Sequence, residues 1–272
     1  ERLKIELNQF QLEQYKIFIP LKNSVTDIKN FNGLKIGRLD GAIYFKYTSN
    51  SFFNLIKQRK NRKISIIKFI PNFIFSLLQS KINSYLNRYN SLILRESDII
   101  VFQSKISKKM HEFFWGEIKK KNLIIYNGVK KTNFIKRNIG PEINLVITAR
   151  FRLNKRLKDA ISLFNELNRI DDRFKLHVIG SLDYLTKKSI SDLDLKNIKF
   201  YGEINYNEIQ SIYSLMHIGI STSIFDPCPN SVVEMMSLSI PVITTSASGA
   251  SELVGINELI VNEKIKFKLY DL

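Results

Sequence analysis

The chain has 272 residues, of which 44% are hydrophobic, which is enough apolar length for one large core or two medium cores. Its single cysteine, Cys228, excludes a disulfide framework and any metal site built from several cysteines. The three histidines, His111, His177 and His217, lie in separate segments without the short spacings of metal-binding motifs. Composition therefore argues against a disulfide-stapled domain and against a metal centre ligated by histidine and cysteine.

The sequence shows no segment of transmembrane length. The longest charge-free stretch of the basic half, residues 69–80, holds 12 residues including Pro71, which is too short to cross a bilayer. No signal peptide is visible, so we expect a cytoplasmic protein that can be peripheral at the inner membrane face. The chain begins with Glu1 rather than Met, so we expect part of the natural N-terminus to be missing.

The net charge of +17 is unevenly distributed. Residues 1–140 carry +18 and residues 141–272 carry −1, and no acidic residue lies between Asp40 and Glu96. A basic cluster in this interval comprises Lys57, Arg59, Lys60, Arg62, Lys63 and Lys68. Together with the apolar segment 64–78, it suits an anionic membrane surface or acceptor. The alternative is a solvated basic face over an ordinary core helix. No nucleic-acid recognition motif accompanies the charge, so nucleic acid is not an expected partner.

The first half of the chain predicts an irregular alternation of elements. In chain order these are strands at 34–38 and 42–45, a mostly helical stretch at 51–90, a strand at 98–104, a helix at 105–114 and a strand at 123–127. The turn dipeptide Asn127-Gly128 closes the last strand, and the polar stretch 130–141 reads as a linker between domains.

The second half alternates strands and helices regularly. The expected elements are strands at 143–149, 174–180, 198–202, 218–222 and 241–245, with helices at 157–167, 207–215 and 231–238. Buried strands that alternate with single helices predict a parallel, doubly wound sheet. Ligands of such sheets bind beyond the carboxyl ends of the strands, where the loop before the last helix falls.

This loop holds two carboxylates, Asp226 and Glu234, with seven residues between them across a Pro-rich turn. The start of a helix presents backbone N–H groups that bind phosphate. A carboxylate on each side of the loop can accept hydrogen bonds from sugar hydroxyls. Phosphate together with sugar predicts a nucleotide-sugar site.

Structural alternatives exist for both acids. Residues 231–234 also read as a capping box, in which Glu234 satisfies the start of its own helix. Asp226 precedes Pro227 and is also a typical turn residue.

Several ordered motifs resemble the retaining glycosyltransferases of family 4, which have the two-domain GT-B fold. The matching segments are 38–41, 98–104, 125–129, 149–156, 200–202, 226–234 and 248–254. The resemblance implies an α/β protein with two doubly wound parallel-sheet, Rossmann-like domains. Residues 1–135 would form a basic, incomplete acceptor-side domain, and residues 136–272 a nucleotide-sugar-binding domain. The glycine-rich loop and the terminal crossing helices of the family are not found, so we expect a chain truncated at both ends.

The resemblance also implies roles for individual residues. Asp226, usually Glu in the family, would face the donor sugar, and Glu234 would bind the ribose hydroxyls. Arg150 and Lys155 would neutralise the diphosphate and stabilise it as a leaving group; otherwise they are ordinary surface cations. The remaining donor-binding positions are the backbone amides of Asn230, Ser231 and Val232, together with Gly202. Asp40 is the acceptor-side candidate, with a turn-forming Asp-Gly as its alternative.

The resemblance implies a hexosyltransferase-type enzyme of polysaccharide biosynthesis. It would move a sugar from a nucleotide-diphosphate-sugar to a saccharide or lipid-linked acceptor with retention, and it would need neither metal nor cofactor. Two alternatives remain at this point. One is a non-catalytic relative that binds nucleotide-sugars, and the other is a membrane- or polyanion-binding module.

Overall fold

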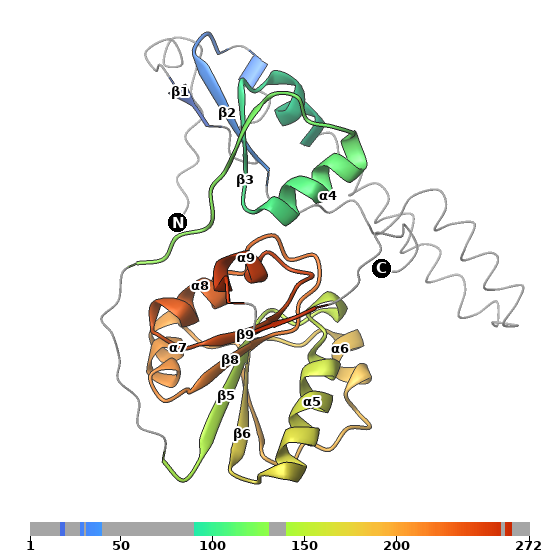
Figure 1. The fold of residues 1–272 in the computed structure, drawn as a ribbon, viewed down its shortest axis with the longest axis vertical. Helices are drawn as coiled ribbons and strands as arrows, with labels where there is room; N and C mark the ends of the chain where they lie inside the picture. The colour runs from blue at the N-terminus through green and yellow to red at the C-terminus, as the bar shows by residue number, and fades with distance from the viewer. Residues whose placement is uncertain are drawn as a thin grey trace, which may run out of the picture. The chain divides into compact units, whose positions relative to one another are not determined.

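The computed structural model describes residues 17–19, 28–29, 31–39, 90–130, 140–256 and 259–262. Asp40, the strand expected at 42–45, the helical stretch at 51–90 except residue 90, and the basic cluster with its apolar segment lie outside these residues. Most of the expected linker 130–141 lies outside them as well. The chain divides into two compact units (Figure 1). The first comprises Glu1–Gln103, Lys108–Ile125 and Lys266–Leu272, and the second comprises Ser104–Ser107 and Tyr126–Ile265.

The first unit contains a parallel sheet in the order β1-β2-β3-β4. Its strands are β1 (Ile17–Phe18), β2 (Leu34–Leu39), β3 (Ile99–Phe102) and β4 (Lys121–Ile124), and α4 (Lys105–Trp115) follows β3. The run Ile-Ile-Val-Phe makes β3 a buried strand, because branched and aromatic side chains fit a pleated surface covered on both faces. Its core packs Leu39, Ile93, Ile100 and Phe102 together.

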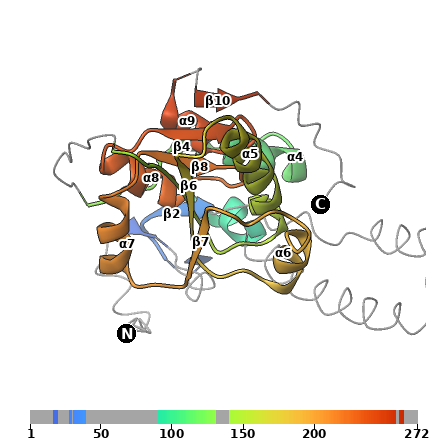
Figure 2. The ribbon, with the colours of Figure 1, turned by 90° about the horizontal axis from the view of Figure 1, so that it is seen from below.

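The second unit contains a larger parallel sheet in the order β10-β9-β8-β5-β6-β7. Its strands are β5 (Ile143–Thr148), β6 (Phe174–Ile179), β7 (Ile198–Gly202), β8 (Ile218–Ser221), β9 (Val242–Thr245) and β10 (Ile260–Val261). Its helices are η2 (Leu153–Lys155), α5 (Leu157–Ile170), α6 (Tyr184–Ser189), α7 (Tyr206–Tyr213), α8 (Asn230–Ser237) and α9 (Ala250–Val254). Helices α5 and α6 cover one face of the sheet, and α7 and α8 cover the other (Figures 1 and 2). The predicted α/β class with two parallel sheets is confirmed.

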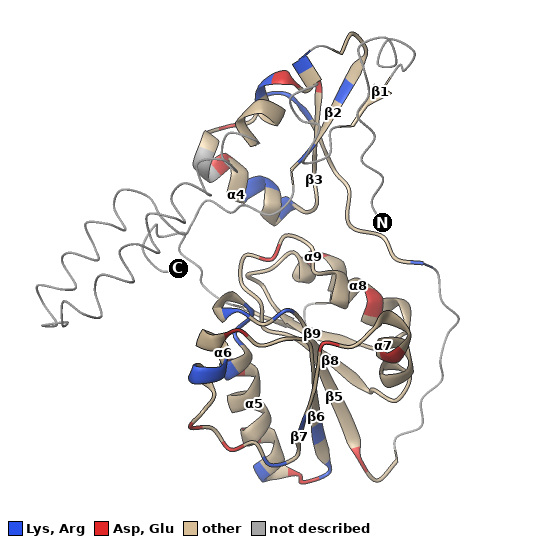
Figure 3. Cartoon of the chain, turned by 180° about the vertical axis from the view of Figure 1, so that it is seen from behind, with Lys and Arg blue, Asp and Glu red and all other residues tan. Residues whose placement is uncertain are grey.

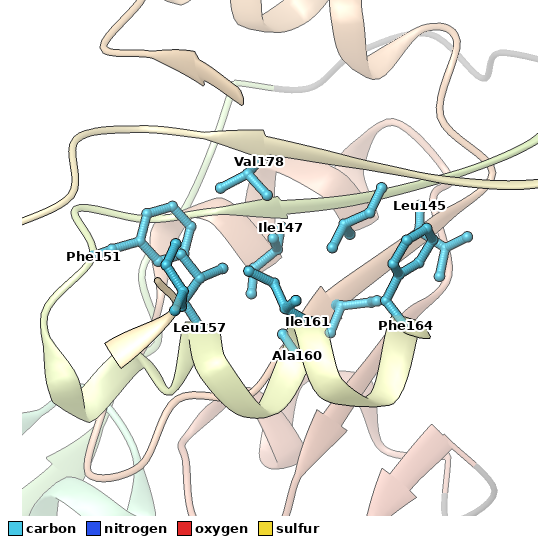
Figure 4. Packing of buried hydrophobic residues seen from close by; sticks show 11 residues of the cluster. Leu145, Ile147, Phe151, Leu157, Ala160, Ile161, Phe164 and Val178 are labelled. Atoms are coloured by element: carbon cyan, nitrogen blue, oxygen red, sulfur yellow. The ribbon is translucent and has the colours of Figure 1, made fainter. Parts of the chain in front are cut away.

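Helix α5 packs against one face of the sheet through a stripe of apolar side chains. Its buried residues recur at positions i, i+3, i+4 and i+7, which places them on one face of the helix. Figure 4 shows this face against side chains of β5 and β6. The residues labelled there are Leu145, Ile147, Phe151, Leu157, Ala160, Ile161, Phe164 and Val178. This packing holds the carboxyl end of β5, and with it the loop that follows, against the body of the unit.

A glycine in β8 sets the position of α8 on the opposite face. A Cβ atom at Gly219 would lie 2.7 Å from the Sδ atom of Met235 and 3.0 Å from Val242. Because the strand has no side chain here, α8 packs close to the sheet through the thioether of Met235. The absence of a side chain at Gly219 therefore allows the helix that carries Glu234 to pack closely against the sheet.

Two of the α-helices described in the second unit were not predicted, and both are short. The first, α6, has 6 residues, and the second, α9, has 5. Neither is long enough to show a helical period, although Asp183 marks the start of α6 by accepting from the N–H of Thr186 at 2.8 Å. The strand predicted at 123–127 is also shifted, because β4 begins at Lys121 and ends at Ile124.

Gly180 offers a test of how closely β5 and β6 must approach. We expect Gly180→Ala to lower the free energy of unfolding of the second unit by more than about 1 kcal/mol. The residue has φ of +123°, and a new Cβ would lie 1.9 Å from the carbonyl oxygen of Ala149. Urea unfolding followed by circular dichroism measures the change. At Gly140 a Cβ meets no described atom within 4 Å, so Gly140→Ala is the control. Equal effects at both positions would contradict the argument.

Candidate functional site

The strand order of the second unit contains one topological switch point between β5 and β8. From β5 the chain proceeds to β6 and β7 on one side, and β8 and β9 lie on the other. At such a point the loops after two adjacent strands run in opposite directions and leave a crevice beyond the strand ends. Lys155 follows β5 and Asp226 follows β8, so both predicted residues lie in the loops that leave this switch point.

Lys155 and Asp226 form an ion pair in which Nζ of the lysine donates to Oδ2 of the aspartate. The two side chains are only 22% and 11% exposed. Lys155 is therefore shielded and paired, unlike a typical surface cation. A shielded ion pair is weak evidence for stability, because desolvation offsets much of the attraction. Its clearest effect is to join the loops after β5 and β8 at a defined separation.

The turn that presents Lys155 is fastened to the loop after β8 by its backbone. The hydroxyl of Thr222 donates to the carbonyl of Lys155 at 2.8 Å and lies 3.2 Å from that of Arg156. The N–H of Ile224 donates to the carbonyl of Asn154 at 2.9 Å. The two loops thus form one hydrogen-bonded structure beneath the ion pair.

The residue before Asp226 is held in a strained backbone conformation. Phe225 has φ of +55°, a left-handed value that a bulky residue rarely adopts. Such a conformation costs on the order of 1–3 kcal/mol and persists where neighbouring contacts enforce it. Here the N–H of Phe225 donates to the carbonyl of Ala247 at 3.0 Å. The strain turns the chain so that Asp226 is presented to Lys155.

The turn at residues 247–249 supports the same loop from its other side. The N–H of Gly249 donates to the carbonyl of Asp226 at 2.8 Å. A Cβ at Gly249 would lie 1.9 Å from the carbonyl oxygen of Pro227, so only glycine permits this approach. The function of the 248–254 motif in this structure is therefore to hold the acidic loop.

Helix α8 begins directly after this loop without a side-chain cap. Its N-cap is Pro229, and no side chain accepts from its first N–H groups. The capping-box interpretation of residues 231–234 is therefore wrong. The N–H of Val232 donates to the carbonyl of Pro229 at 3.1 Å, whereas the N–H groups of Asn230 and Ser231 bond to no residue that the structure describes. Two backbone donors and the positive end of the helix dipole thus meet at one point, which suits an anion.

Glu234 lies within α8 as a half-buried carboxylate. Within the described part of the chain, no group donates a hydrogen bond to its side chain or forms an ion pair with it. Burial raises the pKa of Glu234 above its ordinary range. Burial also raises the pKa of the Tyr213 hydroxyl, with a smaller contribution from the nearby Glu234. A shielded carboxylate without partners is a rare arrangement that marks a candidate ligand site.

Arg150 and Gly202 lie at the same edge of the sheet but in more open positions. Arg150 follows β5, is 75% exposed and lies 4.0 Å from the carboxylate of Glu203, so this ion pair contributes little to stability. Gly202 ends β7 with φ of +70°, and its carbonyl accepts from the N–H of Gly180 at 2.7 Å. Within the described residues, neither one forms a hydrogen bond or an ion pair with Lys155 or Asp226. Figure 3 shows the acidic positions of α7 and α8 on one side of the sheet and the basic positions of α6 on the other.

Two further residues that the sequence analysis noted, a histidine and the single cysteine, serve the fold. His217, directly before β8, accepts from the N–H of Asn144 at 2.9 Å and so serves the packing of the sheet. Cys228 is a free, buried cysteine in the turn before α8. Among the residues that the structure places, no group of three His, Cys, Asp or Glu could hold a metal ion, and no helix has the length and apolarity to cross a membrane.

The raised pKa of Glu234 predicts a specific pH dependence of stability. A carboxyl group whose pKa is higher in the folded than in the unfolded state destabilises the fold as pH rises through that interval. We expect Glu234→Gln to raise the free energy of unfolding at pH 7, and this gain should vanish below the unfolded value of about 4.5. Urea unfolding at pH 4 to 8 measures it. Glu142→Gln, at an exposed position, is the control, and a pH-independent gain at Glu234 would contradict the prediction.

Comparison with solved structures identifies the fold. The chain superposes on the Anabaena protein HepE, crystallised in complex with UDP and glucose, with a TM-score of 0.61 at 15% identity, covering 94% of this chain and 66% of that one. It superposes on Staphylococcus aureus TarM, crystallised as a mutant in complex with UDP and saccharide ligands, with a TM-score of 0.53 at 16% identity, covering 84% and 41%. These similarities confirm the predicted GT-B fold.

Sequence comparison identifies the family. An uncharacterized glycosyltransferase of Methanocaldococcus jannaschii is 23% identical over 241 residues, covering 76% of this chain and 56% of the relative. The chain thus spans little more than half the length of this relative. The family described as "Glycosyl transferases group 1" matches residues 129–266, which include the candidate donor-site residues from Arg150 to Glu234. The chain therefore belongs to the group 1 glycosyl transferases.

Proposed function

We propose that the protein transfers a sugar from a nucleotide-diphosphate-sugar to a hydroxyl acceptor, with the donor bound at the switch point of the second unit. One observation carries the proposal, namely the half-buried carboxylate of Glu234 without a partner among the described residues. It lies on a helix whose first N–H groups are uncapped, and the loop before this helix carries the Lys155–Asp226 ion pair. Carboxylate, amides and a cation are the groups that ribose, phosphate and diphosphate need.

The diphosphate would be bound by Lys155 and by the start of α8. The N–H groups of Asn230 and Ser231 would donate to phosphate oxygens; Val232 is left out because its N–H is already bonded to Pro229. Arg150 is exposed enough to swing from Glu203 toward the second phosphate. HepE and TarM were both crystallised with UDP, which supports a UDP-sugar as the donor.

The two carboxylates would bind the two sugars of the donor. Glu234 would accept hydrogen bonds from the ribose hydroxyls, and Gly202 would leave room for the nucleoside beside β7. Asp226 keeps Oδ1 for the transferred sugar, since Oδ2 accepts from Lys155. Because hydroxyl groups can replace the water lost on burial, the cost of an unpartnered Glu234 would be recovered in the complex.

The reaction would proceed on one face of the sugar with retention. The bond between the anomeric carbon and the diphosphate oxygen breaks, the acceptor oxygen bonds to the same face, and its proton passes to the leaving diphosphate. The protein's part would be to position the donor and to stabilise negative charge on the diphosphate through Lys155, Arg150 and the α8 amides. These fixed donors would make the transfer independent of added metal.

For the acceptor we propose a saccharide or lipid-linked saccharide, and a hexose as the transferred sugar. Asp40 and the basic cluster of residues 57–68 lie outside the described residues, so their roles remain sequence-based predictions. An anionic membrane surface as their partner is likewise a proposal that rests on charge alone.

Removal of the proposed donor contacts should have separable effects. We expect Glu234→Ala to weaken binding of a UDP-sugar about 10- to 100-fold, the value of a charge-assisted hydrogen bond. We expect Lys155→Ala to lower kcat/KM about 100- to 1,000-fold, because the developing charge on the diphosphate loses its fixed cation. Calorimetry with UDP- and GDP-sugars, followed by transfer assays with EDTA present, measures both.

Exposed residues of the same types provide the controls for these variants. Glu142→Ala and Lys187→Ala should leave donor binding unchanged. If the wild-type protein binds no nucleotide-sugar, or if Glu234→Ala and Lys155→Ala bind it as the wild type does, the proposal is wrong. Donor binding without hydrolysis or transfer would instead identify a non-catalytic relative.

The stereochemistry of the product tests the proposed mechanism. We expect the anomeric configuration of the transferred sugar to match that of the donor, because bond breaking and bond making share one face. Proton NMR of the early product, read from the coupling constant at the anomeric position, measures it. An inverted product would exclude the same-face mechanism even if transfer occurs.

A further inference from the structure

A residue outside the predicted site makes three hydrogen bonds to the loop that precedes α8 and to the first residue of that helix. The side-chain amide of Asn127 donates to the carbonyl of Cys228 at 3.1 Å and to Oδ1 of Asn230 at 2.7 Å. The backbone N–H of Asn127 lies 3.4 Å from Sγ of Cys228 and donates to it. All of these residues belong to the second unit, although about a hundred positions separate them in the sequence.

These bonds act on the last residues before the proposed phosphate site. Asn230 is the first residue of α8, and its side-chain oxygen is held by Asn127. The backbone N–H groups of Asn230 and Ser231 stay uncapped in this arrangement. Asn127 thus holds the loop through groups other than the first backbone N–H groups of α8. These N–H groups remain available to bind an anion.

The neighbouring residue provides a second attachment to the same region. The hydroxyl of Tyr126 donates to Oε2 of Glu252 in α9 at 3.0 Å. Burial and this hydrogen bond raise the pKa of Tyr126, so its hydroxyl stays protonated and remains a donor. Helix α9 follows the turn at residues 247–249 that supports Asp226 and Pro227. The acidic loop is therefore held from one side by this turn and from the other by Asn127.

We propose that Asn127 is a positioning residue for the donor site, which holds the Cys228–Asn230 segment so that the first N–H groups of α8 face the diphosphate. The proposal rests on the proposed function, since it assigns Asn127 to the same donor. Asn127 touches neither the donor nor the reacting atoms and acts only through the loop. A displacement of about 1 Å at such a support is enough to cost up to 100-fold in activity.

Asn127→Ala tests the proposal, with Asn165→Ala as the matched control. The amide of Asn165 also donates to a backbone carbonyl, that of Asp194 at 3.0 Å, but on the exposed side of α5. We expect Asn127→Ala to raise the KM for a UDP-sugar about 5- to 100-fold while the KM for the acceptor is unchanged. We expect kcat at saturating donor to change less than the donor KM, because bound donor reorders the loop. Asn165→Ala should match the wild type.

The single cysteine provides an independent readout of the loop. Cys228 is 4% exposed, so its alkylation by iodoacetamide should be slow in the wild type. We expect faster alkylation in Asn127→Ala, and protection when UDP-sugar is added. In a double-mutant cycle, Asn127→Ala should have a smaller effect on donor KM when Asn230 is already Ala, because one of its hydrogen bonds is then absent.

If Asn127→Ala fails to fold, Asn127→Asp provides a second variant of the same size. Its carboxylate only accepts hydrogen bonds, so it cannot replace the amide that donates to Cys228 and Asn230. We expect it to weaken binding of the UDP-sugar at least as much as is expected of Asn127→Ala. Donor KM and alkylation rate equal to the wild type in a folded variant would overturn the proposal. The proposal would also be overturned if the KM for the acceptor rose and kcat fell as much as the donor KM rises, while the alkylation rate of Cys228 stayed unchanged. If the wild type binds no donor, the proposed function itself has failed, and the two failures are thereby distinguished.

Discussion

The Lys155–Asp226 ion pair is the interaction on which the candidate site depends, because it joins loops that leave adjacent strands in opposite directions. Lys155 comes from the loop after β5 and Asp226 from the loop after β8. Parallel pairing of β5 with β8 brings these loops to the same edge, and the strand order makes this edge a topological switch point. The strained Phe225 and the close approach of Gly249 both place Asp226 for this contact. The site is therefore a product of topology first and of local backbone geometry second.

The regular second half of the chain was predictable because its signals are local. Buried apolar strands and amphipathic helices such as α5 have a period that a sequence displays directly, and the parallel sheet follows from their alternation. The short helices α6 and α9 were missed because fewer than two turns show no period. The end of β4 was misplaced because Ile125 continues the apolar run past the last paired residue, Ile124.

The candidate site was predictable by residue type but not by contact. Spacing and resemblance picked out Asp226, Glu234 and Lys155, yet they could not show that the first and last form an ion pair. The capping-box pattern at 231–234 was misleading, because the N-cap lies at Pro229 and the helix starts one residue before Ser231. Asn127 was interpreted as a turn residue because Gly128 follows it, and this local pattern gave no indication of its long-range hydrogen bonds. Contacts between distant segments follow from tertiary packing, which no local pattern records.

In the proposed donor site, the different exposure of the two cations would have a kinetic consequence. Arg150 is 75% exposed and Lys155 is 22% exposed, so bulk salt screens the first far more than the second. An exposed charge at the mouth of a site chiefly affects the rate at which an anionic ligand arrives, whereas a shielded charge affects how long the ligand stays. Ionic strength would therefore alter the association rate through Arg150 and leave the residence time, set at Lys155, nearly constant.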